Sequence, residues 1–439
     1  MVGRIVVQPS LALAYVLIYI RCYVVFLNAN FANAGVDLFR RDAWFLTAAV
    51  AMAVAPVLAY RGPRAISSVI TVLIYLILYV PIIIAFALGS DRSFGEIIRI
   101  EVVFFIGMIL LFLSDTVIVK WPLDLRLGLD LMPFALGASV LVTLYVLVLY
   151  RGSMHFSGFG AELYDQRDAN NAIGAGLVTR YLASWQSTVL IPLCLGYGFV
   201  WRRKTYVVAA GLGALVMYMA AANKISIMFP FVSFAFYIVG RAGFRRFFTL
   251  ATVALIAVIG AIILFAPPRG TPLFLATSIF LNRTIGNGGQ LAVTYYEFFS
   301  YYPRTYYSHV KGFNLLTQYP YGDRQLGQVI GNYYWAADNN ANASFWTTDG
   351  IAAMGLTGVF LATLACAALF VVMNSITRED RLTFVVLCFL SFVVTLLNSS
   401  VFSSFRSGGG FFLLLFFVFN GRRNANGGLG PRRGTFAIA

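Results

Sequence analysis

The residues from 267 to 344 read PPRGTPLFLATSIFLNRTIGNGGQLAVTYYEFFSYYPRTYYSHVKGFNLLTQYPYGDRQLGQVIGNYYWAADNNANAS. This is the longest polar segment of the chain, and it carries ten of the 24 tyrosines. A loop this long within a compact fold is usually either functional or disordered, and disordered segments are poor in aromatic residues. We therefore expect residues 267–344 to fold as a lid or cavity wall.

The composition of the 439-residue chain is that of a membrane protein. Hydrophobic residues make up 60% of it and charged residues 11%, whereas soluble domains carry about 25% charged residues. A membrane span needs about 20 apolar residues. The sequence therefore predicts an all-α, polytopic membrane protein with about twelve transmembrane helices. The predicted spans are residues 11–28, 43–60, 66–88, 98–114, 130–150, 180–200, 205–222, 225–240, 247–266, 345–373, 383–401 and 408–420.

The orientation of these spans follows from the short basic loops, which stay in the cytoplasm. With twelve spans, the basic groups at residues 61–64, 202–204, 241–246, 378–381 and 422–433 all fall on one side. Both termini are then cytoplasmic, and two large loops lie outside. The chain divides into N-terminal transmembrane helices (1–150), a first periplasmic loop (151–179), central transmembrane helices (180–266), a large periplasmic loop (267–344), C-terminal transmembrane helices (345–420) and a cytoplasmic tail (421–439).

Arginine supplies most of the net charge of +15. Six arginines lie in the two outer loops, where the positive-inside bias would deplete them in short loops; they are Arg151, Arg167, Arg269, Arg283, Arg304 and Arg324. Two interpretations stay open. Long loops escape the bias, or these guanidinium groups form a basic cavity for a phosphate-bearing polyanion. Arg406, between the last two spans, either points into the same cavity or lies at the outer headgroups.

Charged residues also fall inside predicted spans. Glu101 and Arg99 lie in the fourth span, and Arg21 lies near the middle of the first. Charges within a membrane are usually paired or line a cavity. We expect Glu101 to pair with Arg21 or Arg99.

The residues exclude several kinds of chemistry and favour one. There is no acidic pair of the kind that holds a metal-bound diphosphate, and no glycine-rich phosphate loop with a lysine. His155 and His309 are the only histidines and have no ligand spacing, so no metal or other cofactor is predicted. What remains is the neutralisation of a pyrophosphate leaving group by fixed arginines. Arg167, Arg283 and Arg304 could converge on one diphosphate.

Other residues of the large loop and of the span that follows it are further candidates for the site. Asn342 or Ser344 could cap the helix of the tenth span, whose N-terminus would attract an anion. The tyrosine pairs, with Trp335, form either an interfacial belt or stacking surfaces for sugars. Between Leu291 and Phe299 the apolar residues share one helical face, which suggests an amphipathic helix lying on the membrane. The candidate general bases for a sugar hydroxyl are Glu297, Asp338 and Asp349.

The order of these motifs resembles a known family. Tyr164-x-x-Arg167 precedes a span that begins Arg180-Tyr181-Leu182-Ala183-Ser184. Asn282-Arg283 and a tyrosine-rich helix follow, and then Asn340-Ala341-Asn342-Ala343-Ser344-Phe345 leads into Gly355-Leu356-Thr357-Gly358-Val359. From about Tyr164 to Phe360 this pattern resembles the Wzy family of O-antigen polymerases. WaaL-type ligases, which share the architecture, place a histidine where this chain has Asn340 and Asn342, so the resemblance favours polymerase over ligase.

The resemblance implies a GT-C-like fold and a metal-independent glycosyltransferase in the bacterial inner membrane. Arg167 and Arg283 would be the essential arginines of the two outer loops. The expected reaction polymerises oligosaccharide repeat units linked to undecaprenyl pyrophosphate, with a chain-length regulator as a further partner and no nucleic acid. The alternatives are an O-antigen ligase and a flippase for lipid-linked oligosaccharides. The remaining expected substrate-binding residues are Arg180, Arg304, Arg324, Asp338, Asn342, Tyr334 and Trp346.

Overall fold

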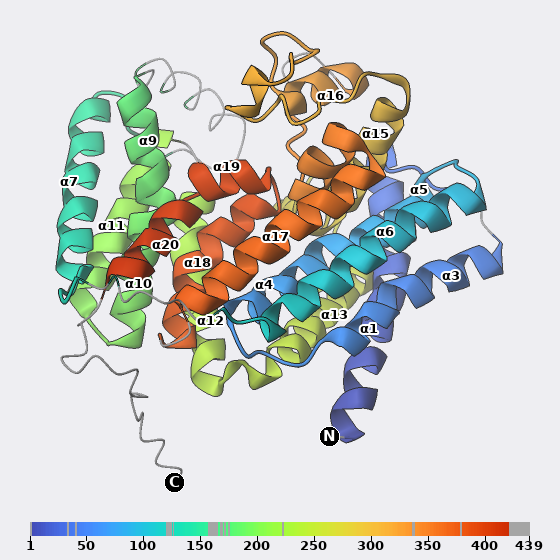
Figure 1. Ribbon diagram of the computed structural model, residues 1–439, viewed down its shortest axis with the longest axis horizontal. Coiled ribbons are helices and arrows are strands. Elements are labelled where there is room, and N and C mark those ends of the chain that lie inside the picture. Colours follow the sequence, from blue (N-terminus) through green and yellow to red (C-terminus); the bar gives the residue numbers. More distant parts are fainter. Residues whose placement is uncertain are drawn as a thin grey trace.

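The computed structural model describes residues 2–32, 35–39, 42–119, 125, 127–156, 166, 170, 173, 176–221, 224–335, 339–377 and 380–420. All regular structure in these ranges is helical (Figure 1). Eight helices are long and apolar enough to cross a membrane: Val7–Phe31, Ile66–Gly89, Phe94–Thr116, Met132–Tyr150, Lys204–Ala221, Ile225–Ala242, Phe244–Phe265 and Leu356–Ile376. The predicted class, an all-α polytopic membrane protein, is therefore confirmed.

The count of twelve spans stays a prediction. Three further apolar helices, Ala43–Ala59, Leu382–Leu396 and Gly410–Phe419, are shorter than a full span. The predicted span at residues 180–200 corresponds to α9 (Leu177–Trp185), a π-helical turn (Gln186–Leu190) and α10 (Ile191–Val200) in direct succession. The tenth span begins at Leu356, not at residue 345, because a separate π-helical segment, η10 (Trp346–Ala352), precedes α17 (Leu356–Ile376).

One group of helices surrounds a central buried helix. That helix consists of α4 (Ile66–Ile74), η4 (Tyr75–Tyr79) and α5 (Val80–Gly89), and every residue of α5 is buried. Around it pack α1 (Val2–Cys22), α3 (Ala43–Val54), α6 (Phe94–Leu113), α13 (Phe247–Phe265), α15 (Asn287–Tyr301) and α17. Their side chains form one continuous apolar core.

A second group packs beside the first. It contains α7 (Met132–Tyr150), α9, α10, α11 (Lys204–Ala221), α12 (Lys224–Ala242), α18 (Leu382–Leu396) and α20 (Gly410–Phe419). Its own core gathers around Cys194, Ala214 and Leu387. All four cysteines are buried and free, as expected of small core residues. Helix α18 contacts both groups and so joins them.

The segment 267–344, here called the cap, begins inside the bundle. It contains α14 (Pro272–Ser278), η8 (Ile279–Gly286), α15 and α16 (Leu326–Tyr334). The predicted apolar face of α15 is buried, but it packs on α5 rather than on a membrane surface. Gly289 makes this possible, because a Cβ atom there would lie 2.3 Å from the Pro81 carbonyl oxygen. The prediction of an amphipathic helix is thus right about which face is buried and wrong about what that face packs against.

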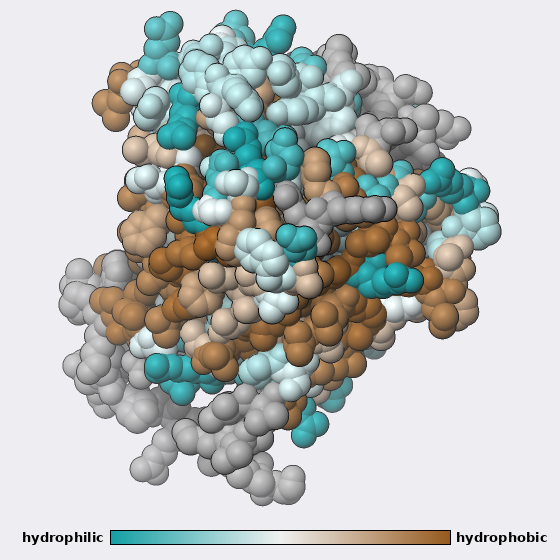
Figure 2. All heavy atoms as spheres, turned by 90° about the vertical axis from the view of Figure 1, so that its right-hand side faces the viewer, coloured by the Kyte–Doolittle hydropathy of each residue, from teal (hydrophilic) through white to brown (hydrophobic). Residues whose placement is uncertain are grey.

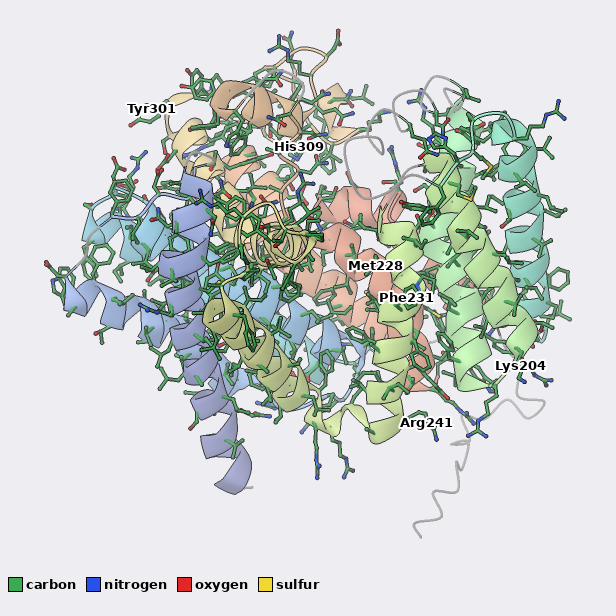
Figure 3. The ribbon with its side chains drawn as sticks, turned by 180° about the vertical axis from the view of Figure 1, so that it is seen from behind. Lys204, Met228, Phe231, Arg241, Tyr301 and His309 are labelled. Atoms are coloured by element: carbon green, nitrogen blue, oxygen red, sulfur yellow. The ribbon has the colours of Figure 1, made fainter. Side chains whose placement is uncertain are left out.

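The short basic loops gather at the end of the bundle opposite the cap. Figure 3 shows Lys204 and Arg241 at one end and Tyr301 and His309 at the other. The Arg381 guanidinium lies 5.4 Å from the centre of the Trp201 ring, which brings the loops before α18 and α11 together. The turn after residues 61–64 joins them, because the Ser67 backbone N–H donates to Asn374 Oδ1 at 3.1 Å. The basic residues of these described loops thus lie at one end, as the charge pattern predicted, whereas the basic group at residues 422–433 lies outside the described residues.

Between these two ends the surface is apolar. Figure 2 shows a band of hydrophobic side chains across the middle of the molecule, with hydrophilic residues above it over the cap. On α12, for example, Phe231 is 68% exposed. Such exposure of large apolar side chains is what a lipid environment accommodates.

Two predicted contacts inside the bundle are corrected by the structure. Glu101 is 1% exposed, and neither carboxylate oxygen has a hydrogen-bond partner among the described residues. Arg21 and Arg99 are both exposed, so the expected ion pair is not formed. Trp346, expected to line a sugar path, is fully buried; its indole N–H donates to Thr363 Oγ1 at 2.8 Å, and its ring packs on Phe104. It is a core residue.

Candidate functional site

A cavity of about 840 Å³ lies beneath the cap at the end opposite the basic loops. One wall is cap residues 308–327, and the other is the polar turn at residues 398–407, which includes α19 (Val401–Arg406). Tyr295, Asn342 and Thr348 contribute to the lining. Small-molecule sites in proteins usually measure about 300–1,000 Å³, so this volume fits a sizeable ligand.

The cavity wall is held in place by backbone contacts between the cap and the end of η10. The Thr305 backbone N–H donates to Ala352 O at 2.9 Å, and that of Tyr306 to Ala353 O at 3.0 Å. Tyr306 and Tyr307 both have left-handed backbones, with φ of 45° and 65°. Such conformations cost roughly 1–3 kcal/mol each and cluster at functional sites. The strained turn places His309 directly after it.

His309 and Asp349 face each other where the cap meets η10. His309 Nε2 lies 3.5 Å from Asp349 Oδ1, and neither atom has a closer polar partner among the described residues. The other ends of both groups are fixed: Nδ1 shares a hydrogen bond of 2.8 Å with Thr305 Oγ1, and Oδ2 accepts the Val401 backbone N–H at 2.6 Å. The result is a buried histidine–carboxylate pair, oriented at both ends.

The pair stands between the large cavity and a smaller apolar one. His309 lines the large cavity, whereas Asp349 lines a crevice of about 200 Å³ on the flank of α17, beside Leu361, Ala362 and Ala365. Phe313 and Phe402 line both spaces. Tyr307 also lines the crevice, and burial together with the Asp349 carboxylate raises the pKa of its hydroxyl, which therefore stays protonated.

The large cavity is basic. Lys311, Arg324 and Arg406 line it, against Asp323 among the acidic lining residues. Of the two positions weighed for Arg406, the structure thus selects the cavity. The predicted substrate residue Arg324 lies there as well, and so does Asn342. Cations in a cleft with low-dielectric walls focus the field and attract anions.

The other predicted site arginines that the structure describes, Arg180, Arg283 and Arg304, do not line this cavity. Arg283 is exposed on η8, and Arg180 is exposed on α9; neither is among the described residues that line the cavity. Arg304 lies against Gly355, donating from Nη1 to Met354 O at 3.5 Å, so it braces the turn before α17. Arg167 lies outside the described residues. Neither Arg283 nor Arg304 is among the described residues that line this cavity, so their convergence with Arg167 on one diphosphate stays a prediction.

The remaining predicted residues of the cap fall elsewhere. Tyr334 is 37% exposed on the outer surface of α16, and Asp338 lies outside the described residues. Among the described residues 339–356, no side-chain oxygen caps η10 or α17. Ser344 lies before η10, where its carbonyl oxygen accepts the N–H groups of Thr347 and Thr348, whereas α17 begins only after Gly355. Of the two candidate bases that the structure describes, Glu297 and Asp349, only Asp349 contacts a residue of the cavity lining, His309.

Sequence reasoning missed part of the wall. The turn Asn398-Ser-Ser-Val-Phe-Ser-Ser-Phe-Arg-Ser407 overlaps the end of the predicted span 383–401 and reaches the start of the next. Five of its uncharged polar side chains line the cavity, namely Asn398, Ser399, Ser400, Ser403 and Ser407. The run of serines at a predicted membrane boundary is the signal that could have identified it. The sequence around His309 holds no motif that identifies it as a site residue, because its partner, Asp349, is 40 residues away along the chain.

Comparisons with family models, with curated proteins and with solved structures find no match for this chain.

Proposed function

We propose that the chain is a membrane glycosyltransferase that joins lipid-pyrophosphate-linked oligosaccharide units at the cap end of the bundle. One observation carries this proposal. Three cationic side chains, Lys311, Arg324 and Arg406, line one cavity together with His309, and the buried partner of His309, Asp349, lies at the adjoining apolar crevice. Cations suit a pyrophosphate, and the oriented pair suits a hydroxyl that must lose a proton.

The proposed reaction is a displacement at a sugar carbon. The hydroxyl oxygen of the acceptor unit attacks the anomeric carbon of the donor glycan, and the bond from that carbon to the pyrophosphate oxygen breaks. Undecaprenyl pyrophosphate leaves with the electron pair, and the hydroxyl proton passes to the pair of His309 and Asp349. The cations of the cavity stabilise the charge that develops on the leaving group; one such donor is worth about 2.7–4 kcal/mol of barrier.

The apolar crevice supports a lipid-linked substrate. It runs along the membrane-spanning helix α17 and shares Phe313 and Phe402 with the basic cavity. An isoprenoid chain could remain in apolar surroundings while its pyrophosphate entered the cavity. A soluble nucleotide-sugar donor would have no use for such a crevice.

A deletion strain tests the proposal. Its surface polysaccharide, separated on a gel, should lose the ladder of long chains while single repeat units still cap the lipid. A plasmid copy should restore the ladder, and one with Arg406→Gln, present at the same level in the membrane, should not. Loss of every unit, with lipid-linked repeats accumulating, would refute polymerisation. The side on which they accumulate would then distinguish a ligase from a flippase.

A further inference from the structure

A cluster of exposed tyrosines lies on the cap outside the cavity. Tyr301 and Tyr302 end helix α15, and Tyr333 and Tyr334 end helix α16. Their exposed fractions are 79%, 40%, 56% and 37%. These four residues are called the tyrosine platform below. Figure 3 shows Tyr301 at the end of the molecule opposite Lys204 and Arg241.

The rings of the platform are exposed and yet held in place. Tyr302 stacks on the buried Phe298 with ring centres 4.4 Å apart, and Tyr333 meets the same ring edge-on at 5.2 Å. The hydroxyl groups of Tyr302 and Tyr333 share a hydrogen bond of 3.3 Å, and Tyr334 packs against Tyr333 at 4.8 Å. Binding a ligand therefore costs these side chains little rotational freedom.

Polar groups border the platform and favour an uncharged ligand. Arg92 lies 5.8 Å from the centre of the Tyr301 ring and 3.5 Å from Glu96. Glu297 is half-buried near Asp91 and Tyr334. Burial, and then the Glu297 carboxylate and the neighbouring tyrosines, raise the pKa of the Tyr334 hydroxyl to about 12. Among the described residues named here, this border holds three carboxylates, Glu96, Asp91 and Glu297, against the Arg92 guanidinium. A negatively charged ligand gains less from such a border than from the basic cavity.

Aromatic contacts connect the platform to the cavity. Tyr319 lines the cavity and packs against Tyr321 at 5.6 Å, and Tyr321 packs on Phe298 at 5.9 Å. Phe298 is the ring beneath Tyr302 and Tyr333. These ring contacts connect a side chain of the cavity lining to the buried ring that supports Tyr302 and Tyr333.

We propose that the tyrosine platform is a second, non-catalytic binding site for an uncharged carbohydrate chain. Sugar rings would stack on the exposed faces of Tyr301, Tyr302 and Tyr333, and their hydroxyl groups would bond to the tyrosine hydroxyls and to the carboxylates of the border. The expected occupant is the growing glycan, an identification that rests on the proposed function. By retaining this glycan, the platform would lengthen the chains made before release.

Equilibrium binding tests the platform without requiring catalysis. The probe is lipid-free oligosaccharide, released by mild acid from the host's surface polysaccharide and titrated into the full-length protein in nanodiscs. The wild type should bind it with a Kd in the millimolar range, and Tyr302→Ala/Tyr333→Ala should bind roughly tenfold more weakly, because stacking and hydrogen bonds are both lost. Tyr302→Phe/Tyr333→Phe keeps the rings and should remain within about threefold of the wild type.

Two further variants keep the test decisive. Tyr301→Ala removes a ring that contacts only Arg92 among the described aromatic and cationic groups, so it should weaken binding without unfolding the cap. Phe134→Ala, which removes a 68% exposed ring on helix α7, should leave binding unchanged. Undetectable binding by the wild type, or equal binding by the alanine variants, would overturn the platform and leave the tyrosines as a membrane belt.

Different variants test the proposed transferase and the proposed carbohydrate site. Asp349→Asn, which removes the proposed transfer, should bind the oligosaccharide as the wild type does. Loss of transfer in that variant therefore reports on the cavity. Loss of oligosaccharide binding in the platform variants, with shorter chains in the complemented strain, reports on the platform.

Discussion

Replacing Asp349 separates its structural contribution from its chemical one. Its Oδ2 atom accepts the Val401 N–H at 2.6 Å in a fully buried site. Asp349→Ala leaves that donor unpaired, which costs about 1–3 kcal/mol, and also empties space in the core. Asp349→Asn retains an amide oxygen for Val401, so only the difference between a charged and a neutral acceptor is lost, about 1 kcal/mol.

The two variants should nevertheless lose transfer alike. Neither offers a carboxylate to His309, so the proton acceptor is lost in both, and the rate should fall by about 10²–10⁴-fold. The assays are thermal unfolding of the purified protein and product formation from a lipid-linked repeat unit. Asp130→Asn is the matched control, because Asp130 Oδ1 also accepts a backbone N–H, from Met132 at 3.0 Å, but outside the cavity. Transfer by Asp349→Asn within threefold of the wild type would refute the role of the pair.

Further predictions concern packing and charge. Gly289→Ala should lower the free energy of unfolding by about 1–3 kcal/mol, because its Cβ would meet the Pro81 carbonyl oxygen at 2.3 Å. The control is Gly137→Ala, in open space on α7, which should raise the free energy of unfolding by up to about 1 kcal/mol. Equal melting temperatures for the two variants would contradict the close packing of α15 on α5. Glu101→Met should stabilise the protein by about 1–3 kcal/mol, since it removes a buried carboxyl that has no hydrogen-bond partner among the described residues. A lower melting temperature than the wild type would contradict this expectation. Burial, and then Asp91, raise the pKa of Glu297 in the folded protein above 4.5. Because a carboxyl with a raised pKa takes up protons on folding, Glu297 lowers the free energy of unfolding progressively as the pH rises past 4.5. Glu297→Gln should therefore unfold at a higher temperature than the wild type at pH 7 and lose this advantage near pH 4, and a constant difference between the two pH values would contradict the assignment.

Sequence reasoning could predict what depends on local composition. Apolar runs predicted the helices, and short basic loops predicted which ends of the helices lie together, because both are properties of contiguous residues. The buried face of α15 followed from the spacing of Leu291, Tyr295, Phe298 and Phe299. Its location did not, because the docking of α15 on α5 depends on Gly289 and on a carbonyl oxygen far away in the chain.

The candidate site was harder to predict, because it joins three distant segments. The convergence of the arginines is predicted from their positions in the two outer loops, but Arg304 contacts the backbone before α17 and Arg283 lies on an exposed helical turn. The sequence does predict Arg324 and Asn342 as substrate-binding residues, and both line the cavity. For Arg406 it allows either the cavity or the outer headgroups. The pairing of His309 with Asp349 depends on a strained turn at Tyr306 and Tyr307, for which the sequence holds no glycine as a signal.

The most direct test of the central claim is a count of products in a purified system. The protein in nanodiscs receives one substrate, an oligosaccharide repeat unit linked to undecaprenyl pyrophosphate, and both the glycans and the released lipid are measured. The proposed function predicts dimers and longer chains that remain on the lipid, with one undecaprenyl pyrophosphate released for each new glycosidic bond. Substrate that stays monomeric in the presence of protein, or glycan released free of lipid, would contradict it.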